Sequence, residues 1–287
     1  MDLKKRDCPL ILRDVDALRR AVAGWRADGE IIALTPTMGA LHAGHVSLVE
    51  MAKRHASRVV MSIFVNPTQF AAGEDFGAYP RSFEADVAAF GAAGGDIVFA
   101  PAVEAMYGAG FATAIHVAGP ALVGLEDRTR PTHFSGVATV VAKLLNQCRP
   151  DIAVFGEKDY QQLKVIARLA RDLDLDVKIL AAPTLREKDG LALSSRNVYL
   201  APAERAAAPA LYGALVACAA AIRAGVGLDV ALEDARRAVA KAGFIIDYVE
   251  ARNAETLEPL RGVTDDPIRL LAAARLGKTR LIDNIAV

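Results

Sequence analysis

Cysteine is scarce in this chain, and its placement excludes one class of fold. The three residues, Cys8, Cys148 and Cys218, are odd in number, lie far apart and form no Cys-x-x-Cys pair. A disulfide framework needs an even set of cysteines in an oxidising compartment. We therefore expect reduced thiols and a fold that relies on its hydrophobic core, which 287 residues can build over two unequal domains.

An excess of one charge and long apolar runs are also missing. The 34 Lys and Arg residues equal the 34 Asp and Glu residues, so no basic surface for nucleic acid or an anionic membrane is indicated. The longest uncharged stretches, 105–125 and 206–222, are interrupted by glycine or proline, and neither predicts a membrane span. No apolar segment is typical of a signal peptide. We expect a cytoplasmic protein with small-molecule partners, no nucleic acid and no membrane.

Three common nucleotide-binding and hydrolase motifs are absent as well. The sequence contains no G-x-x-x-x-G-K-[ST], no G-x-G-x-x-G and no G-x-S-x-G. Their absence argues against a P-loop ATPase, a dinucleotide-dependent dehydrogenase and an α/β-hydrolase.

The strongest functional signal is the stretch 31–46, which reads IIALTPTMGALHAGHV. Its apolar beginning predicts a buried parallel strand that Pro36 should end, and the glycine that follows permits a tight turn. His42 and His45 then stand at the start of a predicted helix, where a spacing of three places both rings on one face. The N–H groups and positive dipole end of that helix favour an anion such as a nucleotide phosphate.

Two other interpretations of the histidine pair stay open. Each histidine alone is typical of an ordinary surface or core residue, and short motifs also occur by chance. A metal site is the third interpretation, although two histidines without a cysteine or carboxylate at ligand spacing give it little support.

Apolar periodicity predicts an α/β fold. Strands alternate with helices up to residue 183, as in a doubly wound, Rossmann-like parallel sheet, and two helices followed by three strands then predict a smaller C-terminal α+β domain. We therefore divide the chain into domains 1–183 and 184–287. The expected strands are 31–35, 58–65, 97–100, 112–117, 152–155, 177–180, 245–250, 269–273 and 280–285, and the expected helices are 14–26, 46–55, 83–93, 134–148, 159–171, 203–224 and 230–242.

Polar residues follow three of the predicted core strands, in segments 37–45, 66–69 and 156–159. Ligands of an open parallel sheet bind beyond the carboxyl ends of its strands, so these segments predict one shared crevice. Gln69 and Gln162 are each typical of exposed amides, but as a pair they can hydrogen-bond a hydroxylated substrate, because amides both donate and accept.

Lys158 and Arg196 are the expected phosphate partners, since lysine acts as a mobile point charge and arginine as a planar fork. Arg196 follows Ser194 and Ser195 in the loop between the two predicted domains. The local sequence is compatible both with a solvated hinge and with a loop that grips a phosphate.

An ordered series of sequence blocks resembles the pantoate–β-alanine ligase family. The first, PTMGALHAGH at 36–45, is similar to that family's version of the HIGH signature of a nucleotidyltransferase superfamily. The ordered set is more specific, and the resemblance extends over about residues 30–285. The other blocks are FVNPTQF at 64–70, YPR at 79–81, RPTHFSGV at 130–137, FGEKDYQQ at 155–162, DGLALSSRN at 189–197, ARLG at 274–277 and LIDN at 281–284.

The resemblance implies that ATP, (R)-pantoate and β-alanine give pantothenate, AMP and pyrophosphate through pantoyl adenylate, with Mg²⁺ and in a homodimer. It implies as catalytic residues His42, His45, Lys158, Ser194, Ser195 and Arg196. The residues that it implies for ATP binding are Met38, Gly39, Ala40, Leu41, His42, Ala43, Gly44, His45, Gly156, Glu157, Lys158, Asp159, Leu185, Leu193, Ser194, Ser195 and Arg196. It implies as substrate-binding residues Asn66, Gln69, Tyr79 and Gln162, and as a magnesium ligand Asp86, on a helix expected to be exposed.

Other functions stay open at this point. Another adenylyl-transferring enzyme of the HxGH superfamily would use the same first block, whereas an aminoacyl-tRNA synthetase is disfavoured by the balanced charge and by Ser-Ser-Arg-Asn in place of Lys-Met-Ser-Lys-Ser. A non-catalytic nucleotide-binding protein is the second class, since a fold alone does not determine function. The combination of His42, His45, Lys158 and Arg196 counts against that second class.

Overall fold

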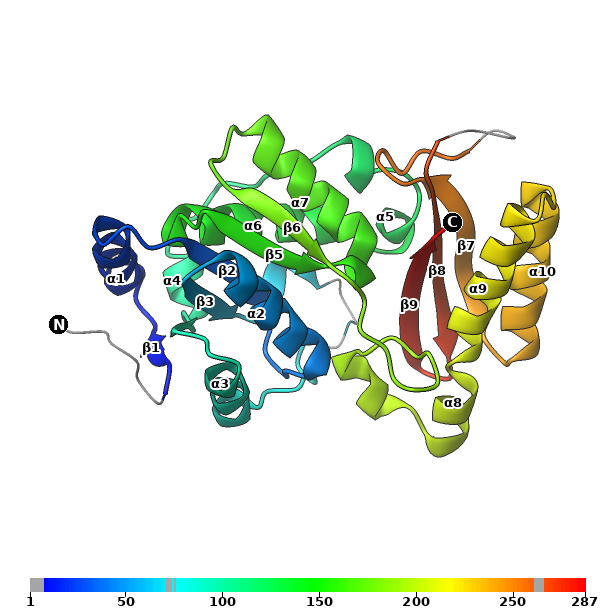
Figure 1. Cartoon of the computed structure of the whole chain (residues 1–287), viewed down its shortest axis with the longest axis horizontal. Helices are drawn as coiled ribbons and strands as arrows, with labels where there is room; N and C mark the ends of the chain where they lie inside the picture. Colours follow the sequence, from blue (N-terminus) through cyan, green and yellow to red (C-terminus); the bar gives the residue numbers. More distant parts are fainter. Residues whose placement is uncertain (1–7, 71–73, 75, 261–265) are drawn as a thin grey trace.

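The computed structural model describes residues 8–70, 74, 76–260 and 266–287. Within them a parallel sheet of six strands and an antiparallel sheet of three strands lie at opposite ends of an elongated molecule (Figure 1). The strands are β1 (Leu10–Leu12), β2 (Ile32–Thr37), β3 (Arg58–Ile63), β4 (Ile97–Phe99), β5 (Ile152–Gly156), β6 (Lys178–Ala182), β7 (Ile245–Asn253), β8 (Ile268–Leu276) and β9 (Thr279–Ala286). The α-helices are α1 (Val15–Ala27), α2 (Ala43–His55), α3 (Phe83–Ala92), α4 (Val103–Met106), α5 (Glu126–Thr129), α6 (His133–Cys148), α7 (Tyr160–Asp172), α8 (Pro202–Ala207), α9 (Ala210–Arg223) and α10 (Leu228–Lys241).

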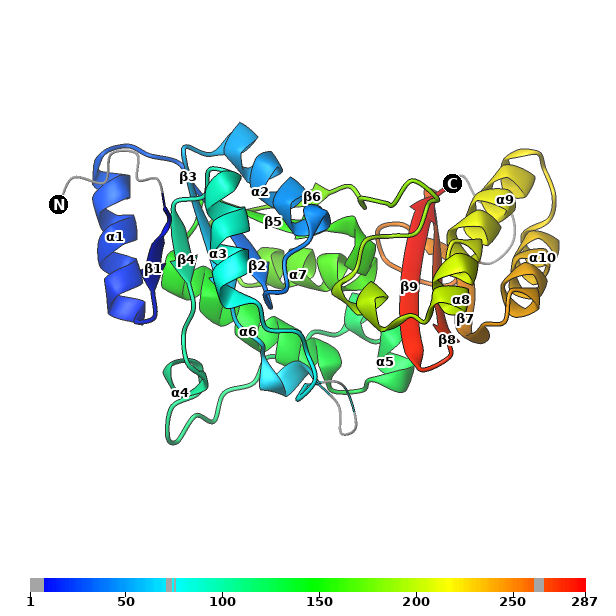
Figure 2. The ribbon, with the colours of Figure 1, turned by 90° about the horizontal axis from the view of Figure 1, so that it is seen from below.

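The parallel sheet has the strand order β1-β4-β3-β2-β5-β6 and carries helices on both faces, which confirms the predicted doubly wound architecture (Figure 2). The direction of successive side chains along β2 shows why both faces of the sheet are covered by helices. Ile32 and Leu34 belong to the core that α1, α6 and α7 cover, whereas Ala33 between them belongs to the core that α2 and α3 cover. Successive side chains of a strand point to opposite faces, so a strand that is apolar throughout must be buried on both.

The antiparallel sheet, with the order β7-β8-β9, also has two buried faces. On one face Val249 and Leu270 pack with helices α9 and α10. On the other face Tyr248 and Leu271 join the same core as the parallel sheet. The C-terminal sheet is therefore packed against the parallel-sheet region and not merely tethered to it.

The strand predicted at 112–117 is wrong, and β1 takes its place at the edge of the sheet. Leu10 pairs with Ile97 and Leu12 with Phe99, a pairing that the sequence analysis missed because the run is only three residues long. Residues 112–117 form no strand but pass over α6, where the N–H of Ile115 donates to a threonine hydroxyl at 2.9 Å.

The expectation that Pro36 ends its strand is also wrong, because β2 continues to Thr37. The carbonyl of Thr37 accepts from Phe64 after β3, so the backbone groups of Pro36, one residue earlier, face the side of β5. Pairing of β2 with β5 has already stopped at Leu34. The missing N–H of Pro36 therefore leaves no ladder hydrogen bond unmade.

The single helix expected at 203–224 is two helices, α8 and α9, separated at Ala208 and Pro209. Proline lacks the N–H that a continuous helix would need there. By length and composition alone residues 202–223 are apolar enough to cross a membrane. Leu211, Leu215 and Cys218 of α9, however, are buried against the C-terminal sheet, as in a core helix.

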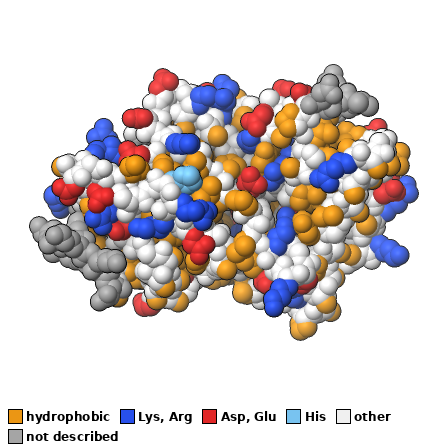
Figure 3. Space-filling view, viewed as in Figure 1, with side chains coloured by type: hydrophobic (Ala, Val, Ile, Leu, Met, Phe, Trp, Pro, Cys, Tyr) orange, Lys and Arg blue, Asp and Glu red, His pale blue; other side chains and the backbone are white. Residues whose placement is uncertain are grey.

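The remaining predicted strands and helices are confirmed, with their ends shifted by up to a few residues. The face shown in Figure 3 carries Lys and Arg side chains interspersed with Asp and Glu, in keeping with the balanced composition.

Candidate functional site

A cavity of about 240 Å³ opens at the carboxyl ends of β2, β3 and β5. It joins residues that are more than 150 positions apart in the chain. The structure thus brings the three predicted segments together with the loop between the domains. The predicted site residues that line the cavity are Met38, His42, Gly44, His45, Asn66, Gln69, Tyr79, Gly156, Lys158, Asp159, Gln162, Leu185, Leu193, Ser194, Ser195 and Arg196.

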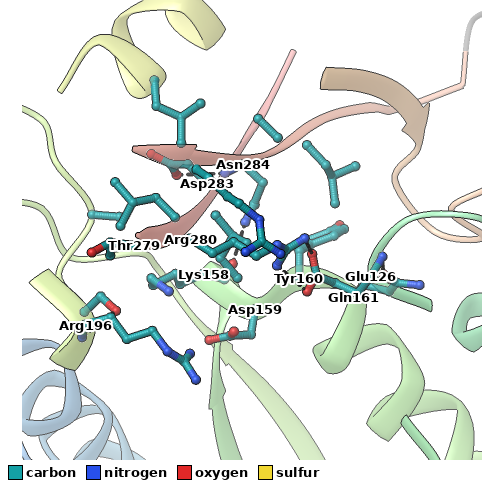
Figure 4. Close-up of a pocket in the computed structure, with 18 of the residues that line it drawn as sticks. Glu126, Lys158, Asp159, Tyr160, Gln161, Arg196, Thr279, Arg280, Asp283 and Asn284 are labelled. Atoms are coloured by element: carbon teal, nitrogen blue, oxygen red, sulfur yellow. Dashed lines mark hydrogen bonds and ion pairs between the residues drawn. The ribbon is translucent and has the colours of Figure 1, made fainter. Parts of the chain in front are cut away.

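A second cavity, of about 450 Å³, adjoins the first and extends between the two sheets, where β8 and β9 form its other side. Figure 4 shows Lys158, Asp159 and Arg196 at this cavity, opposite residues of β9. The residues common to both cavities are Arg130, His133, Lys158, Asp159, Gln162, Ser194 and Arg196.

The two histidines are held by the first turn of α2. His42 is the N-cap residue, and its Nδ1 accepts a hydrogen bond from the N–H of Gly44 at 3.1 Å. The Nδ1 of His45 accepts from the N–H of His42 at 3.3 Å, and the ring centroids are 4.2 Å apart. Because a backbone N–H can only donate, a neutral ring in either position carries its proton on Nε2.

Both rings are held in the neutral form. Burial, followed by the nearby charge of Lys158, lowers the pKa of His42 to about 4. Burial, followed by the neighbouring His42 and by Lys158, lowers the pKa of His45 to about 3. At neutral pH the site therefore presents two fixed Nε2–H donors and the ammonium group of Lys158, an arrangement suited to the oxygens of a phosphate.

Asp86 shapes the turn before these histidines. Its carboxylate is only 2% exposed, which corrects the expectation of an exposed residue. One oxygen accepts from the N–H of Ala40 at 2.9 Å and the other from Leu41 at 2.8 Å. Position 39 requires glycine for two reasons: its φ is +83°, and a Cβ there would lie 2.9 Å from the Asp86 carboxylate. Both carboxylate oxygens are engaged by the turn, and these contacts give the predicted magnesium role no support.

Gln69 is held in place by its neighbours. Its Oε1 accepts from Asn66 at 3.1 Å, and its Nε2 lies 3.1 Å from the sulfur of Met38. Asn66 itself is 1% exposed and also bonds Tyr107 and the carbonyl of Gly136, so its contacts support Gln69 and not a ligand. A Cβ on Gly136 would lie 2.3 Å from the carbonyl oxygen of residue 68, and the close approach of α6 to this segment therefore requires glycine.

The loop that carries Ser194, Ser195 and Arg196 contacts the opposite wall of the site. The hydroxyl groups of Tyr79 and Ser195 are 3.3 Å apart, and Tyr79 is 5% exposed. The hydroxyl of Tyr199, at the end of the same loop, donates to the carbonyl of Ala78 at 3.1 Å. Two tyrosines thus connect this loop to the segment around residue 79.

Other predicted residues lie outside both cavities or behind their walls. Glu157 points toward the C-terminal sheet, where its carboxylate pairs with Arg269 at 3.1 Å. The predicted ATP-binding residues that line neither cavity are Gly39, Ala40, Leu41, Ala43 and Glu157. Among the residues that the structure describes, no group of three or more His, Cys, Asp or Glu side chains could hold a metal ion.

Arg130, His133 and Thr184 also line the smaller cavity, although no role is predicted for them from the sequence. The Nδ1 of His133 lies 2.9 Å from the carbonyl oxygen of Gln69, and Arg130 donates to the same oxygen at 3.2 Å. Burial, followed by the charge of Arg130, lowers the pKa of His133 to about 4. The RPTHFSGV block contained the first two, whereas only the structure shows that the Thr184 hydroxyl is buried without a partner among the described residues.

Comparisons with known proteins agree with this geometry. Residues 10–286 match the family model described as pantoate–β-alanine ligase. The chain is 61% identical to pantothenate synthetase 2 of Bradyrhizobium diazoefficiens and 58% identical to a pantothenate synthetase of Rhodopseudomonas palustris, each over 97% of this chain and 99% of the relative.

Solved structures give the same result. The pantothenate synthetase of Thermus thermophilus is 46% identical, with a TM-score of 0.91 over 96% of this chain and 98% of that one. The pantoate–β-alanine ligase of Francisella tularensis, solved with β-γ ATP and β-alanine, is 32% identical, with a TM-score of 0.79 over 97% of both chains. With a family model that spans nearly the whole chain and relatives that match end to end, the protein belongs to the pantoate–β-alanine ligase family.

Proposed function

We propose that this protein is an ATP-dependent ligase that joins (R)-pantoate to β-alanine through pantoyl adenylate and releases AMP and pyrophosphate. The observation that carries the proposal is the smaller cavity. It is lined by two neutral histidine donors, by Lys158 and the Ser194–Arg196 loop, and by the amides of Gln69 and Gln162. The names of the relatives and the ligands of the Francisella structure support the same reaction.

In the first step an oxygen of the pantoate carboxylate attacks the α-phosphorus of MgATP. The bond from that phosphorus to the bridging oxygen breaks, and pyrophosphate leaves with the electron pair. His42 and His45 donate through Nε2 to oxygens whose charge grows as the bond breaks, while Lys158, Ser194, Ser195 and Arg196 hold the departing pyrophosphate. Catalysis of this kind depends on positioning and electrostatic stabilisation more than on covalent chemistry.

In the second step the amine of β-alanine, in its neutral form, attacks the acyl carbonyl of pantoyl adenylate. The carbon–oxygen bond to AMP breaks, the nitrogen loses one proton, and pantothenate and AMP are formed. The larger cavity adjoins the adenylate site and so provides room for β-alanine. Its lining contains carboxylates as well as cationic side chains, among them Arg196 and Arg130, the second of which pairs with Glu74 at 2.6 Å.

The proposal also covers magnesium, the location and oligomeric state of the protein, and its domain boundary. Magnesium enters as part of the substrate MgATP, since no acidic cluster among the described residues provides a site of its own. We also propose that the protein is cytoplasmic and, as the family resemblance implies, a homodimer. We further propose a domain boundary between residues 183 and 184, just after β6; the second core cluster, which draws on residues from Leu191 onward, supports it.

The decisive experiment is a product assay with purified protein, MgATP and pantoate, with and without β-alanine. We expect AMP and pantothenate to appear together only when β-alanine is present, with one pyrophosphate released for each. A stable adenylylated product that accumulates without ligation would indicate another adenylyltransferase of the superfamily. No turnover of ATP with pantoate under any condition would overturn the assignment of the substrate.

A further inference from the structure

Two consecutive residues near the C-terminus, Asp283 and Asn284, hold two loops of the nucleotide site. They belong to the LIDN block, to which the proposed function assigns no role. Asp283 is 4% exposed and Asn284 is 2% exposed, and both lie on β9 of the C-terminal sheet. Figure 4 shows both residues on the strand that lies next to the segment that carries Lys158 and Asp159.

The side chain of Asn284 forms hydrogen bonds with the main chain of that segment. Its Nδ2 donates to the carbonyl oxygens of Glu157 and Lys158, each at 2.9 Å. Its Oδ1 accepts from the Nε of Arg269 at 2.7 Å. Because a guanidinium group only donates and a carbonyl oxygen only accepts, this set of partners permits one orientation of the amide. Every polar atom of the side chain is engaged.

Arg269 of β8 also contacts the same segment, through an ion pair and a ring contact. Its Nη2 donates to the carboxylate of Glu157 at 3.1 Å, and its guanidinium group lies over the ring of Tyr160, 4.0 Å from the centroid. The residues on both sides of Lys158 are therefore tied to the C-terminal sheet, through side chains as well as main chain.

Asp283 contacts the other loop, as expected for neighbouring residues of a strand that point to opposite faces. Its carboxylate forms a bidentate pair with Arg186, with distances of 2.6 and 2.8 Å. Arg186 also donates to the carbonyl of Gly190 at 3.1 Å and forms an isolated bridge with Ala192. One residue further along on each side, Leu193 donates to Leu185 at 3.0 Å, and both of these leucines line the smaller cavity.

We propose that Asp283 and Asn284 are positioning residues of the nucleotide site, with Asn284 setting the place from which Lys158 reaches the phosphates. The C-terminal domain then builds part of the site and is more than a cover for it. A long lysine side chain has many rotamers, so its ammonium group can be confined only if its main chain is fixed first. This inference rests on the proposed function, in which Lys158 acts on the leaving pyrophosphate.

A double-mutant cycle tests the inference. Asn284→Ala, Lys158→Ala and the double variant are compared in pantoate-dependent release of pyrophosphate. We expect Asn284→Ala to lower kcat about 10- to 100-fold, as a misplacement of about 1 Å does, and to change the KM for pantoate less than about twofold. The double variant should lose no more than Lys158→Ala alone, because Asn284 acts through Lys158.

Asn253→Ala is the matched control. The Oδ1 of Asn253 accepts two backbone hydrogen bonds in the same domain, from Glu255 at 2.8 Å and Thr256 at 3.0 Å, and the residue lines neither cavity. We expect its kcat to stay within about twofold of the parent. If the Asn284→Ala variant does not fold, Asn284→Ser, which keeps one donor, replaces it in the cycle with a smaller expected loss.

Two results would overturn the inference: a rate for Asn284→Ala equal to that of the control, or a double variant whose loss is the product of the two single losses. The same variants are also measured for MgATP affinity by calorimetry, where the same non-additive pattern is expected. If the parent protein shows no turnover with pantoate, the proposed function fails, while the binding cycle still decides whether Asn284 acts through Lys158.

Discussion

The two ends of the parallel sheet differ in whether their charged and polar side chains are paired within the protein or face a cavity. At the amino ends of the strands, Arg58 pairs with Glu30 at 2.9 Å and with Asp96 at 3.1 Å, and Lys53 lies 3.6 Å from Asp96. Asp96 also accepts from the N–H of Val59 at 2.9 Å. Each of these four charged side chains therefore has a partner of opposite sign within the protein.

At the carboxyl ends the polar groups are aimed into a cavity. His42 and His45 use one ring nitrogen each for the backbone and keep the other as a donor. Lys158 forms no ion pair with any residue in the described part of the chain, and its charge contributes to the lowered pKa of both rings. The comparison teaches that one end of the sheet uses its charges for stability, whereas the other keeps its donors for a ligand.

The sharpest way to break this comparison is to remove a donor at the carboxyl end. We expect His42→Ala to lower the rate of adenylate formation about 10²- to 10³-fold, the usual cost of losing one preorganised donor to developing charge. The rate is measured as pyrophosphate release. His55→Ala, an exposed histidine at the end of the same helix, is the control and should leave the rate unchanged. An unaltered rate in His42→Ala would contradict the assigned role.

A smaller effect is expected when one of the two tyrosine hydroxyls that connect the Ser194–Arg196 loop to the segment around residue 79 is removed. Tyr79→Phe keeps the buried ring but removes the contact with Ser195 at 3.3 Å. A net hydrogen bond of about 0.5–1.5 kcal/mol predicts a fall in kcat of about 2- to 13-fold. The double variant with Ser195→Ala should be no slower than Ser195→Ala alone. Additive losses would show that Tyr79 acts independently of Ser195.

Lowering the pH should reduce the free energy of unfolding through the buried histidines at the carboxyl end of the sheet. Burial lowers the pKa of His42, His45 and His133 to between about 3 and 4, whereas these groups have a pKa of 6.5 in the unfolded chain. The unfolded chain then binds more protons below pH 6.5, so the free energy of unfolding should fall as the pH falls from 7 toward 4. Urea unfolding at pH 7 and pH 5 measures this. His45→Gln should lessen the dependence, because it removes one of the three buried histidines.

The smallest effect on turnover is expected at the amino end. Asp96→Asn weakens the pairs with Arg58 and Lys53 without touching either cavity. We expect the free energy of unfolding to fall by about 1–2 kcal/mol, as for a partly buried charged hydrogen bond. The rate of pantothenate formation should stay within about twofold. A large loss of activity without a loss of stability would contradict the division between the two ends.

Local features of the site could be predicted because they depend on short stretches of chain. The strand, glycine turn and paired histidines of residues 31–46 follow one another directly, and their geometry is determined by backbone rules. Burial could not be predicted in the same way. Asp86 was expected to be exposed, yet the turn at Ala40 and Leu41 encloses its carboxylate.

The errors in the fold have the same origin. An edge strand of three residues and an extended segment at 112–117 look alike in sequence, and only the contacts of β4 and α6 decide between them. A proline is expected to end a strand that is paired on both sides, but beside Pro36 the neighbouring strand β5 has already diverged.

The alternation of strands and helices, the phosphate-binding turn and the order of the family's blocks can be predicted from the sequence, since each depends on residues close in the chain. The tertiary structure alone decided how these parts face one another. It brought Asn284 to Lys158 across 126 positions and Asp283 to Arg186 across 97. Such contacts form because burial leaves a polar group only one satisfied arrangement, and that arrangement depends on the packing of the whole chain.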